Sequence, residues 1–231
     1  PSKSLDHASA AARFTWQTEQ TDFALSYHYG WETLPTITSF PVKNINYSGG
    51  RDIDIDQLLD DAVFTEERVE AKYKRQQTFG FEWETVFDPI GFRGEIAHID
   101  NVAFLTSDLT SKRRAVTPLV SGIDYVSATE WYFNLQGSWH HIHDYTDKIL
   151  YFEQDTVAVF GEVSKPVWRG NLELSTKYHY TLTDKSSYLQ PSITLKYFRN
   201  LESEIGAMFF DGDEDTLMGS YDHADQVYLR L

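Results

Sequence analysis

The sequence predicts an all-β protein: an antiparallel up-and-down transmembrane β-barrel, of which about 11 strands are visible in the 231 residues. Apolar and polar residues alternate along most of the chain, and successive side chains of a strand point to opposite faces. The connections between these segments are short and long in turn, as in membrane barrels. Aromatic residues make up 15% of the chain and charged residues only 24%, an unusual balance for a soluble acidic protein.

The stretch from Ala115 to His141 contains the clearest predicted hairpin. From Thr117 to Tyr125 every second residue falls on one face, and 127–130 reverses the chain. The returning segment alternates again and places on one face Trp131, Phe133, Leu135, Gly137 and Trp139. Two alternating segments joined by a turn predict an antiparallel pair with one apolar and one polar face.

The other strands are predicted by the same alternation. Residues 69–87 read as one long strand, and Asp88-Pro89-Ile90-Gly91 after it reads as a β-turn, because proline sets the backbone angle that such a turn needs. The full set of further predicted strands is 10–18, 22–31, 69–87, 92–104, 154–165, 169–180, 188–198, 202–210 and 225–231.

Connection length alternates along the predicted strands. Membrane barrels have tight periplasmic turns and extended extracellular loops, whereas the Greek-key crossings of a sandwich mix the two ends. We therefore expect one partial barrel domain over 1–231, with a long extracellular loop at 32–68 and an acidic extracellular loop at 211–224. Bacterial single-chain barrels have an even number of strands, so the odd number predicts further strands upstream of Pro1.

Composition excludes several classes of function. The chain carries 20 Lys and Arg against 35 Asp and Glu, a formal net charge of −15. Nucleic acid needs a basic footprint, so no nucleic-acid partner is expected. The absence of cysteine excludes disulfides, thiolate metal sites and a cysteine nucleophile. No apolar run is long enough for a membrane-spanning helix.

The polar faces of the predicted strands give the candidate lumen-lining residues. Both signs of charge occur there, often as neighbours on one strand. Two roles stay open for them: ion pairs that fill or brace a narrow barrel, or the lining of a solute path. The candidates are Arg13, Lys72, Lys74, Glu82, Glu84, Arg93, Glu95, Asp124, Gln136, His140, Glu173, Lys177, His179, Lys196, Glu202, Glu204 and Arg230.

The tryptophans lie near the ends of predicted strands. Aromatic side chains of membrane barrels gather in girdles at the two lipid interfaces. The predicted lipid-interface aromatics are Trp16, Trp31, Trp83, Trp131, Trp139 and Trp168.

Metal binding and catalysis are weakly indicated. The run His140-His141-Ile142-His143-Asp144 matches no standard zinc spacing. Asp211, Asp213 and Asp215 resemble a calcium loop without the EF-hand pattern, so they are weak candidates beside the expectation of no metal and no cofactor. Ser138 and His140 share a face but lack a third member, so no catalytic residue and no enzyme activity are expected.

Several segments resemble a known family. Phe23–Pro35 resembles the pattern of an alternating strand followed by Tyr-x-Tyr-Gly-Trp/Tyr-x-x-Leu-Pro. That pattern is found in a poorly characterised family of proteobacterial outer-membrane barrels akin to the alginate-export porins. Three other segments resemble the same family: Gly91–Ala97, Leu189–Ile193, and Phe209–Asp215 with Tyr221–Leu231. The resemblance covers nearly the whole chain, which looks like the family's C-terminal portion, and it carries over no catalytic residue.

The resemblance and the patterning together predict an outer-membrane β-barrel that forms a pore or an export or uptake channel for a hydrophilic solute. The expected partners are outer-membrane lipid and lipopolysaccharide, with possible envelope proteins. One alternative is a structural barrel with a plugged lumen that acts as a sheath or docking platform in an envelope complex. The other is a soluble β-sandwich or lipocalin-like binding protein whose apolar face is a core.

Overall fold

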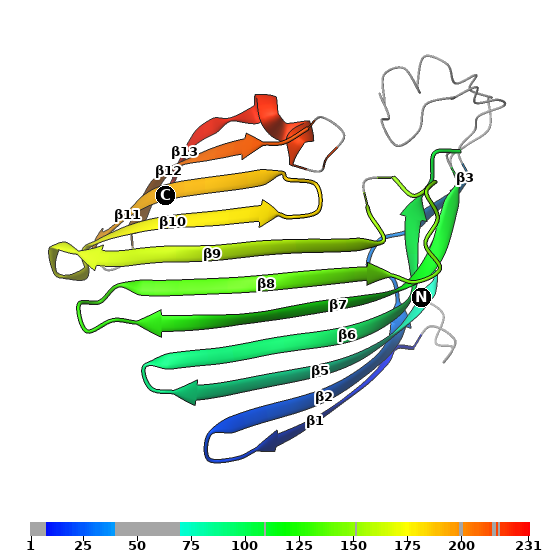
Figure 1. The fold of residues 1–231 in the computed structure, drawn as a ribbon, viewed down its shortest axis with the longest axis horizontal. Coiled ribbons are helices and arrows are strands. Elements are labelled where there is room, and N and C mark those ends of the chain that lie inside the picture. The colour runs from blue at the N-terminus through cyan, green and yellow to red at the C-terminus, as the bar shows by residue number, and fades with distance from the viewer. Residues whose placement is uncertain are drawn as a thin grey trace.

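The computed structural model describes residues 8–39, 70–108, 110–150, 152–198, 201–213, 216 and 218–231. They form an all-β fold dominated by one 11-stranded antiparallel sheet (Figure 1). Its strands are β1 Ala10–Gln17, β2 Thr21–Trp31, β5 Arg75–Phe87, β6 Ile90–Leu105, β7 Ser111–Val126, β8 Tyr132–Ile142, β9 Asp155–Val167, β10 Leu172–Thr181, β11 Ser187–Phe198, β12 Leu201–Asp211 and β13 Gln226–Arg230.

Each strand of the large sheet pairs with its neighbour in the chain, so the topology is up-and-down throughout. A second, two-stranded sheet pairs β3 Thr36–Ser39 with β4 Glu70–Lys72. Short 3-10 helices, η2 Trp168–Gly170 and η3 Gly219–Ala224, lie in two of the connections. The predicted all-β class and the 11 antiparallel strands are confirmed.

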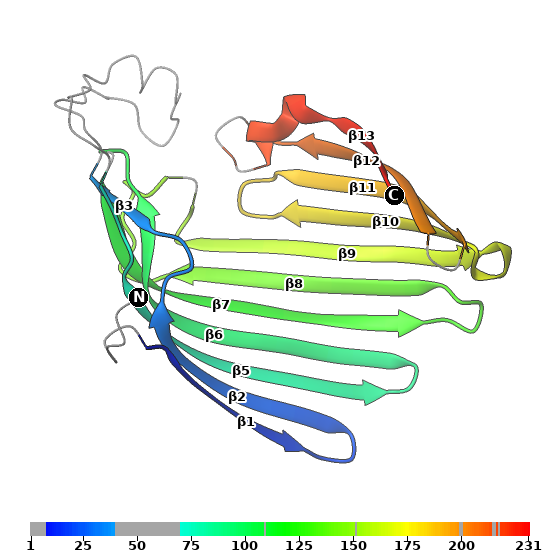
Figure 2. The ribbon, with the colours of Figure 1, turned by 180° about the vertical axis from the view of Figure 1, so that it is seen from behind.

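The sheet is open: the described strands do not close into a barrel, and the predicted barrel is confirmed only as an antiparallel up-and-down sheet. In the described residues β1 has β2 as its only neighbour, and β13 has only β12. Every pairing in the sheet is antiparallel, so the two edge strands run in the same direction. Figures 1 and 2 show the result from both sides as a single twisted layer.

The pairing register gives the sheet one apolar face and one polar face, because directly opposed residues of an antiparallel pair lie on the same side. One continuous apolar row crosses six strands through Leu25, Phe81, Ile96, Leu119, Trp139 and Val157. A continuous row on the other face runs through Asp22, Glu84, Arg93, Gly122, Gln136 and Phe160. We call the two sides the apolar face and the polar face.

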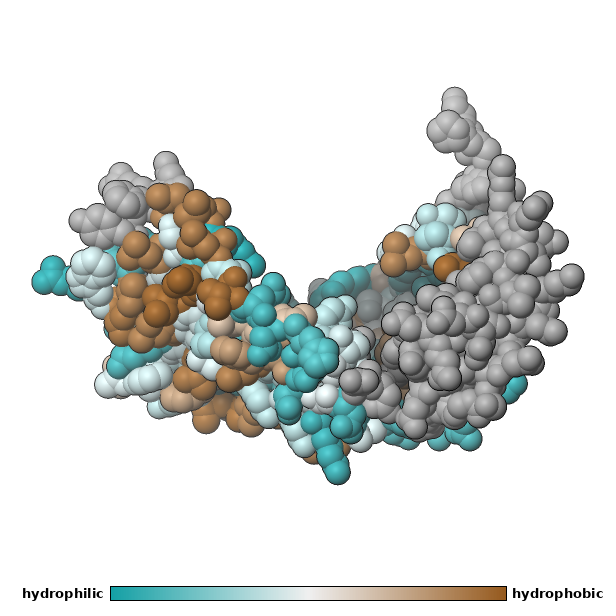
Figure 3. Space-filling view, turned by 90° about the horizontal axis from the view of Figure 1, so that it is seen from above, coloured by the Kyte–Doolittle hydropathy of each residue, from teal (hydrophilic) through white to brown (hydrophobic). Residues whose placement is uncertain are grey.

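The apolar face is exposed along the whole sheet. Leu25 is 56% exposed on β2, Leu135 54% on β8 and Ile205 52% on β12. Among the described residues, no second layer packs against this face. Figure 3, seen from above Figure 1, shows apolar side chains gathered over β12 and β13. The register places Val227 and Leu229 on the apolar face there. Exposed apolar surface of this extent marks an interaction with protein or with lipid.

A small packed core lies instead at one end of the strands. Phe104, Val116, Ile142 and Ile149 are each at most 6% exposed and pack together. Ile149 belongs to the 143–154 connection, which folds back onto the sheet and bridges to Thr106. The backbone N–H of Leu150 donates to the carbonyl of Leu105 at 3.1 Å. The large buried apolar side chains of the described residues therefore gather where this connection covers the sheet.

Several predicted boundaries are wrong. The predicted turn 88–91 is shorter, because Ile90 and Gly91 already pair with β5. Residues 69–87 are two strands, because the chain leaves β4 and its small sheet before β5 begins at Arg75. β7 begins at Ser111, so the 106–110 connection is no longer than 127–131 at the opposite end. The predicted strand 154–165 ends two residues too early, because Pro166 and Val167 still pair with β10.

The difference in connection length between the two ends therefore depends on 32–74, 143–154 and 212–225, which all lie at the same end. Most of the predicted 32–68 loop lies outside the described residues. Within the described part of the chain, no helix has the length and apolarity to cross a bilayer.

Candidate functional site

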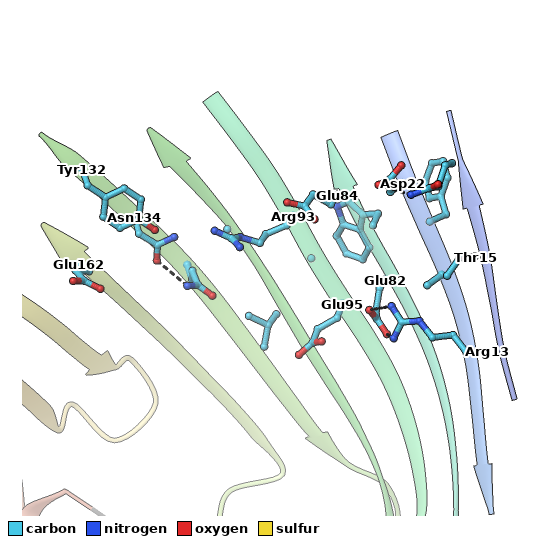
Figure 4. A pocket seen from close by; sticks show the side chains of 18 residues that line it. Arg13, Thr15, Asp22, Glu82, Glu84, Arg93, Glu95, Tyr132, Asn134 and Glu162 are labelled. Atoms are coloured by element: carbon cyan, nitrogen blue, oxygen red, sulfur yellow. Dashed lines mark hydrogen bonds and ion pairs between the residues drawn. The ribbon is translucent and has the colours of Figure 1, made fainter. Parts of the chain in front are cut away.

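The polar face forms a hollow of about 610 Å³. Its lining comes from strands β1, β2 and β5 to β9 of the large sheet, so the sheet curves toward this face there. Figure 4 shows side chains from these strands pointing into a common space. The charged lining residues are Arg13, Asp22, Glu82, Glu84, Arg93, Glu95 and Glu162.

An ion pair between distant segments crosses the hollow at its β1 end. Arg13 on β1 donates to both carboxylate oxygens of Glu82 on β5, at 2.9 and 2.8 Å, across the intervening β2 (Figure 4). Such a two-pronged contact fits the planar guanidinium to the carboxylate. Both side chains are more than a third exposed, so the pair contributes orientation more than stability.

A second ion pair joins β6 and β7. Arg93 donates to Asp124, and Gly91 lies directly opposite Asp124 in the register. A Cβ atom at Gly91 would overlap the Asp124 carboxylate, so the glycine provides the space in which that carboxylate lies across β6. The neighbouring amides also contact each other, with Gln136 donating to Asn134 at 2.7 Å.

Hydrogen bonds connect the polar side chains of β11 to β13. Tyr188 donates to Gln190, and the Gln190 amide donates to the Tyr228 hydroxyl at 2.7 Å. Tyr228 donates in turn to Glu204, which also pairs with Arg230 at 3.4 Å. A separate pair joins Lys196 to Glu173.

Most of the predicted lumen residues lie on the polar face. The register places there Arg13, Glu82, Glu84, Arg93, Glu95, Asp124, Gln136, His140, Glu173, Lys177, His179, Lys196, Glu202, Glu204 and Arg230. Lys72 and Lys74 do not belong to this set. Lys72 lies on β4 in the small sheet and Lys74 lies between β4 and β5, because the chain leaves the large sheet there.

The structure adds polar-face residues that the sequence prediction omitted. Asp22, Tyr132, Asn134 and Glu162 all line the hollow. Alternation along β9 is enough to place Glu162 on the polar face. Asp22 begins its predicted strand, where alternation assigns a face least clearly.

The predicted interface tryptophans lie toward the two ends of the strands. Trp16, Trp131 and Trp168 are 62%, 39% and 62% exposed near the short connections, and Trp83 is on the same side of the sheet as Trp16. Lys165 lies 4.7 Å above the Trp131 ring. At the opposite end Trp31 is 37% exposed, and the Trp139 indole donates to Asp155 at 2.8 Å.

A histidine cluster lies on the apolar face near the long connections. Thr117 Oγ1 is 3.1 Å from His98 Nδ1 and 2.9 Å from His143 Nε2, and the rings of His141 and His143 are 4.7 Å apart. His98 lies far from the 140–144 run in the chain, so only the pairing of strands brings it into this cluster. His140 is separate from this cluster because it points to the polar face, near the Phe152 ring.

Two of the three weak metal candidates, Asp211 and Asp213, lie in described residues. Asp211 ends β12, and the backbone carbonyl of Asp213 accepts hydrogen bonds from Thr216. Asp215 lies outside the described residues. Across the ranges that the structure describes, no three His, Asp or Glu side chains are arranged to hold a metal ion.

Two carboxylates outside the strands of the large sheet fix the connections. Burial raises the pKa of Glu32, but hydrogen bonds from Arg113 and Thr36, the Arg113 charge and the Lys74 N–H outweigh it, so the pKa lies below its usual value. Hydrogen bonds from Thr106 and Thr110, helped by Lys148, hold the pKa of Asp108 well below its usual value. Both groups therefore stay ionised at neutral pH.

Comparison with known proteins places the chain in no family. No protein-family model matches the chain, and no curated protein matches it. The arrangement itself provides a polar, charged hollow on one side of a sheet and a continuous apolar surface on the other. In chemical terms, the hollow can contact a hydrated solute through carboxylate, guanidinium and amide groups.

Proposed function

We propose that this sheet is part of the wall of an outer-membrane β-barrel that forms a pore for a hydrophilic solute. The supporting observation is the exposed apolar face, which crosses the sheet from Leu25 on β2 to Leu229 on β13. Water disfavours such a surface by about 25 cal/mol per Å² of apolar area, whereas hydrocarbon accepts it. The polar face is then the lumen side.

Three further features fit a membrane barrel. The apolar face carries tryptophans toward both ends of the strands, as lipid interfaces require. The three longest connections lie at one end, which corresponds to the extracellular side. The family resemblance of the Phe23–Pro35 segment points to the same class of protein.

Closure of the barrel needs further strands. The unpaired edges of β1 and β13 would be left in hydrocarbon, where each unsatisfied backbone group costs several kcal/mol. Because β1 and β13 run in the same direction, direct pairing between them would be parallel. An all-antiparallel barrel is obtained when an odd number of additional strands lies between them.

Two adjacent residues on opposite faces provide the test. Leu135 is 54% exposed on the apolar face, and Gln136 lines the polar hollow. In a membrane barrel Leu135→Arg costs roughly 2–4 kcal/mol, since it places a charge in hydrocarbon. Gln136→Arg, the matched control, adds the same charge to the wet side and costs less than about 0.5 kcal/mol.

The measurement is the yield of folded protein in vesicles and the free energy of unfolding there, followed by conductance across planar bilayers. A protein that is monodisperse in plain buffer and tolerates both substitutions equally is the soluble binder, and the membrane proposal fails. Folding in vesicles with asymmetric tolerance but without conductance for small ions identifies the structural barrel with a plugged lumen.

A further inference from the structure

The basic side chains of the polar hollow are neutralised by neighbours. Arg13 gives both prongs of its guanidinium to Glu82, and Arg93 pairs with Asp124. These are the two basic residues among those that line the hollow. Each therefore contributes little net positive field to a solute in the space in front of it, since its charge is matched within a few ångströms.

The remaining carboxylates have no such compensation. Glu84 and Glu95 line the hollow and, in the described part of the chain, have no cationic side chain within ion-pair distance. Glu162 accepts a hydrogen bond from the Ser175 hydroxyl at 2.8 Å, which stabilises its charge without cancelling it. Asp22 on β2 is the fourth; it accepts a hydrogen bond from the Gln17 amide at 3.4 Å. The four come from strands β2, β5, β6 and β9, so they are spread around the hollow.

The pairing register explains why the positive and negative charges of the hollow do not cancel. Glu84 is directly opposite Arg93 in the register, but the Arg93 side chain points away from Glu84 (Figure 4). It pairs instead with Asp124 on β7, the strand on the other side of β6. Gly91 leaves the space for that choice. Glu95 is opposite Glu82 and Val120, so neither cross-strand neighbour offers a cation. Along β6 the charges of Arg93 and Glu95 balance. In the folded sheet Arg93 is neutralised by Asp124, so the charge of Glu95 remains.

The rest of the polar face does not offset this excess. On β10 to β13, Lys196 pairs with Glu173 and Arg230 with Glu204. Lys177 on β10 lies directly opposite Glu162 in the register; no ion pair joins them, so Lys177 offsets part of the Glu162 charge without cancelling it. The negative excess in the hollow is therefore greatest on β2, β5 and β6, where Asp22, Glu84 and Glu95 have no cationic partner in the described residues.

We propose that this hollow makes the pore prefer cations and cationic hydrophilic solutes over anions. The inference rests on the proposed pore function. Uncompensated carboxylates around a water-filled passage raise the local concentration of cations and repel anions, as acidic rings do in cation channels. Arg13 and Arg93 act as structural counter-ions that limit the excess, so removing one of them should strengthen the preference.

The test is the ratio of K⁺ to Cl⁻ permeability of the full-length protein in planar bilayers, obtained from the reversal potential in a KCl gradient. We expect a ratio above 1 that falls at least about twofold in Glu84→Gln/Glu95→Gln/Glu162→Gln. Arg93→Gln, which releases Asp124, should raise it. The matched control Glu19→Gln/Asp88→Asn/Glu130→Gln removes three charges from the short connections and should change it less.

The outcomes separate the two proposals. Conductance with a ratio at or below 1, or a ratio that the triple hollow variant leaves unchanged, overturns the cation preference and leaves the pore standing. Absence of conductance from protein folded in vesicles overturns the pore and this inference with it. Folding of each variant is checked by its migration on unheated gels and by circular dichroism.

Discussion

The same kinds of apolar side chain occur in two opposite environments in this molecule. At the long-connection end, Ile142 and Ile149 are 0% and 2% exposed, because the 143–154 connection folds back onto the sheet and packs its Ile149 against Ile142 and its neighbours. On the apolar face, Ile123 and Ile205 are 47% and 52% exposed and no element covers them. The chain can thus build a packed core, but it does so only locally. The difference is consistent with the proposed membrane setting, in which lipid covers the apolar face.

The largest effect is expected where a charge pair is buried at the long-connection end. Glu32 is 8% exposed and its side chain is held by Arg113. Arg113→Ala leaves that carboxylate buried without its partner and should cost roughly 3–5 kcal/mol of unfolding free energy. Arg13→Ala, which removes an exposed pair, should cost less than about 1 kcal/mol. Urea titration in detergent micelles measures the unfolding free energy of both variants. Equal losses would contradict the difference expected between the buried and the exposed ion pair.

Isoleucine truncation compares the two environments directly. Ile149→Ala should cost roughly 2–5 kcal/mol in any medium, because it loses apolar burial and leaves a cavity. Ile123→Ala creates no cavity, so in vesicles it should lose only the transfer term, about 1–2 kcal/mol, and in plain buffer almost nothing. Unfolding free energies in the two media check this. An Ile123→Ala cost that does not depend on the medium would show that lipid does not contact this face.

Two glycines on the apolar face allow a finer comparison. A Cβ atom at Gly94 would overlap the Trp83 ring, whereas nothing lies within 4 Å of one at Gly137. Gly94→Ala should displace the indole, shift its fluorescence and cost about 1 kcal/mol or more. Gly137→Ala should leave fluorescence and stability almost unchanged. A shift in both variants, or in neither, would mean that the Trp83 ring does not rest on β6.

The smallest effect concerns the anchoring of the 106–110 connection and its pH dependence. Asp108 accepts hydrogen bonds from Thr106 and Thr110, both at 2.6 Å, and its pKa in the folded state is lowered. A lowered pKa contributes stability that is complete above the unfolded-state value, about 4, and is lost as pH falls from there toward the folded value.

Asp108→Asn should therefore cost up to about 1 kcal/mol at pH 7, a small figure because the side chain is 43% exposed. The difference between the variant and the parent protein should shrink as the pH is lowered below 4. Hydrogen exchange of the 106–110 amides as a function of pH measures it. A difference that persists unchanged at low pH would exclude the ionised carboxylate as its cause.

The expected loss of unfolding free energy depends on the environment of each side chain rather than on its chemical type. Arginine, isoleucine and glycine each appear twice, once in a packed position and once in an open one. Where a neighbour closes over the side chain, truncation or enlargement has nowhere to relax and costs several times more. Agreement across all pairs would support a sheet with one locally packed end and an apolar face that requires lipid.

The sequence alone determined the class of the fold and the division of side chains between two faces. Alternation is a local property of a strand, so it placed Arg13, Glu95 and Gln136 on one side and Leu25, Leu135 and Trp139 on the other without knowledge of their neighbours. It also predicted the number of strands in the large sheet. Its errors occurred at Lys72 and Lys74, where a second small sheet interrupts the alternation.

Only the tertiary structure decided which groups meet. Arg93 pairs with Asp124 rather than with Glu84 or Glu95, and His98 joins His141 and His143, because contacts across strands depend on register. Register depends on connection lengths and on irregularities such as the shift between Ile99 and Val102. Alternation with a period of two assigns each side chain to a face of the sheet, but it does not say which residue of the neighbouring strand lies opposite. The acidity of the hollow and the position of the core therefore depend on how the strands pair.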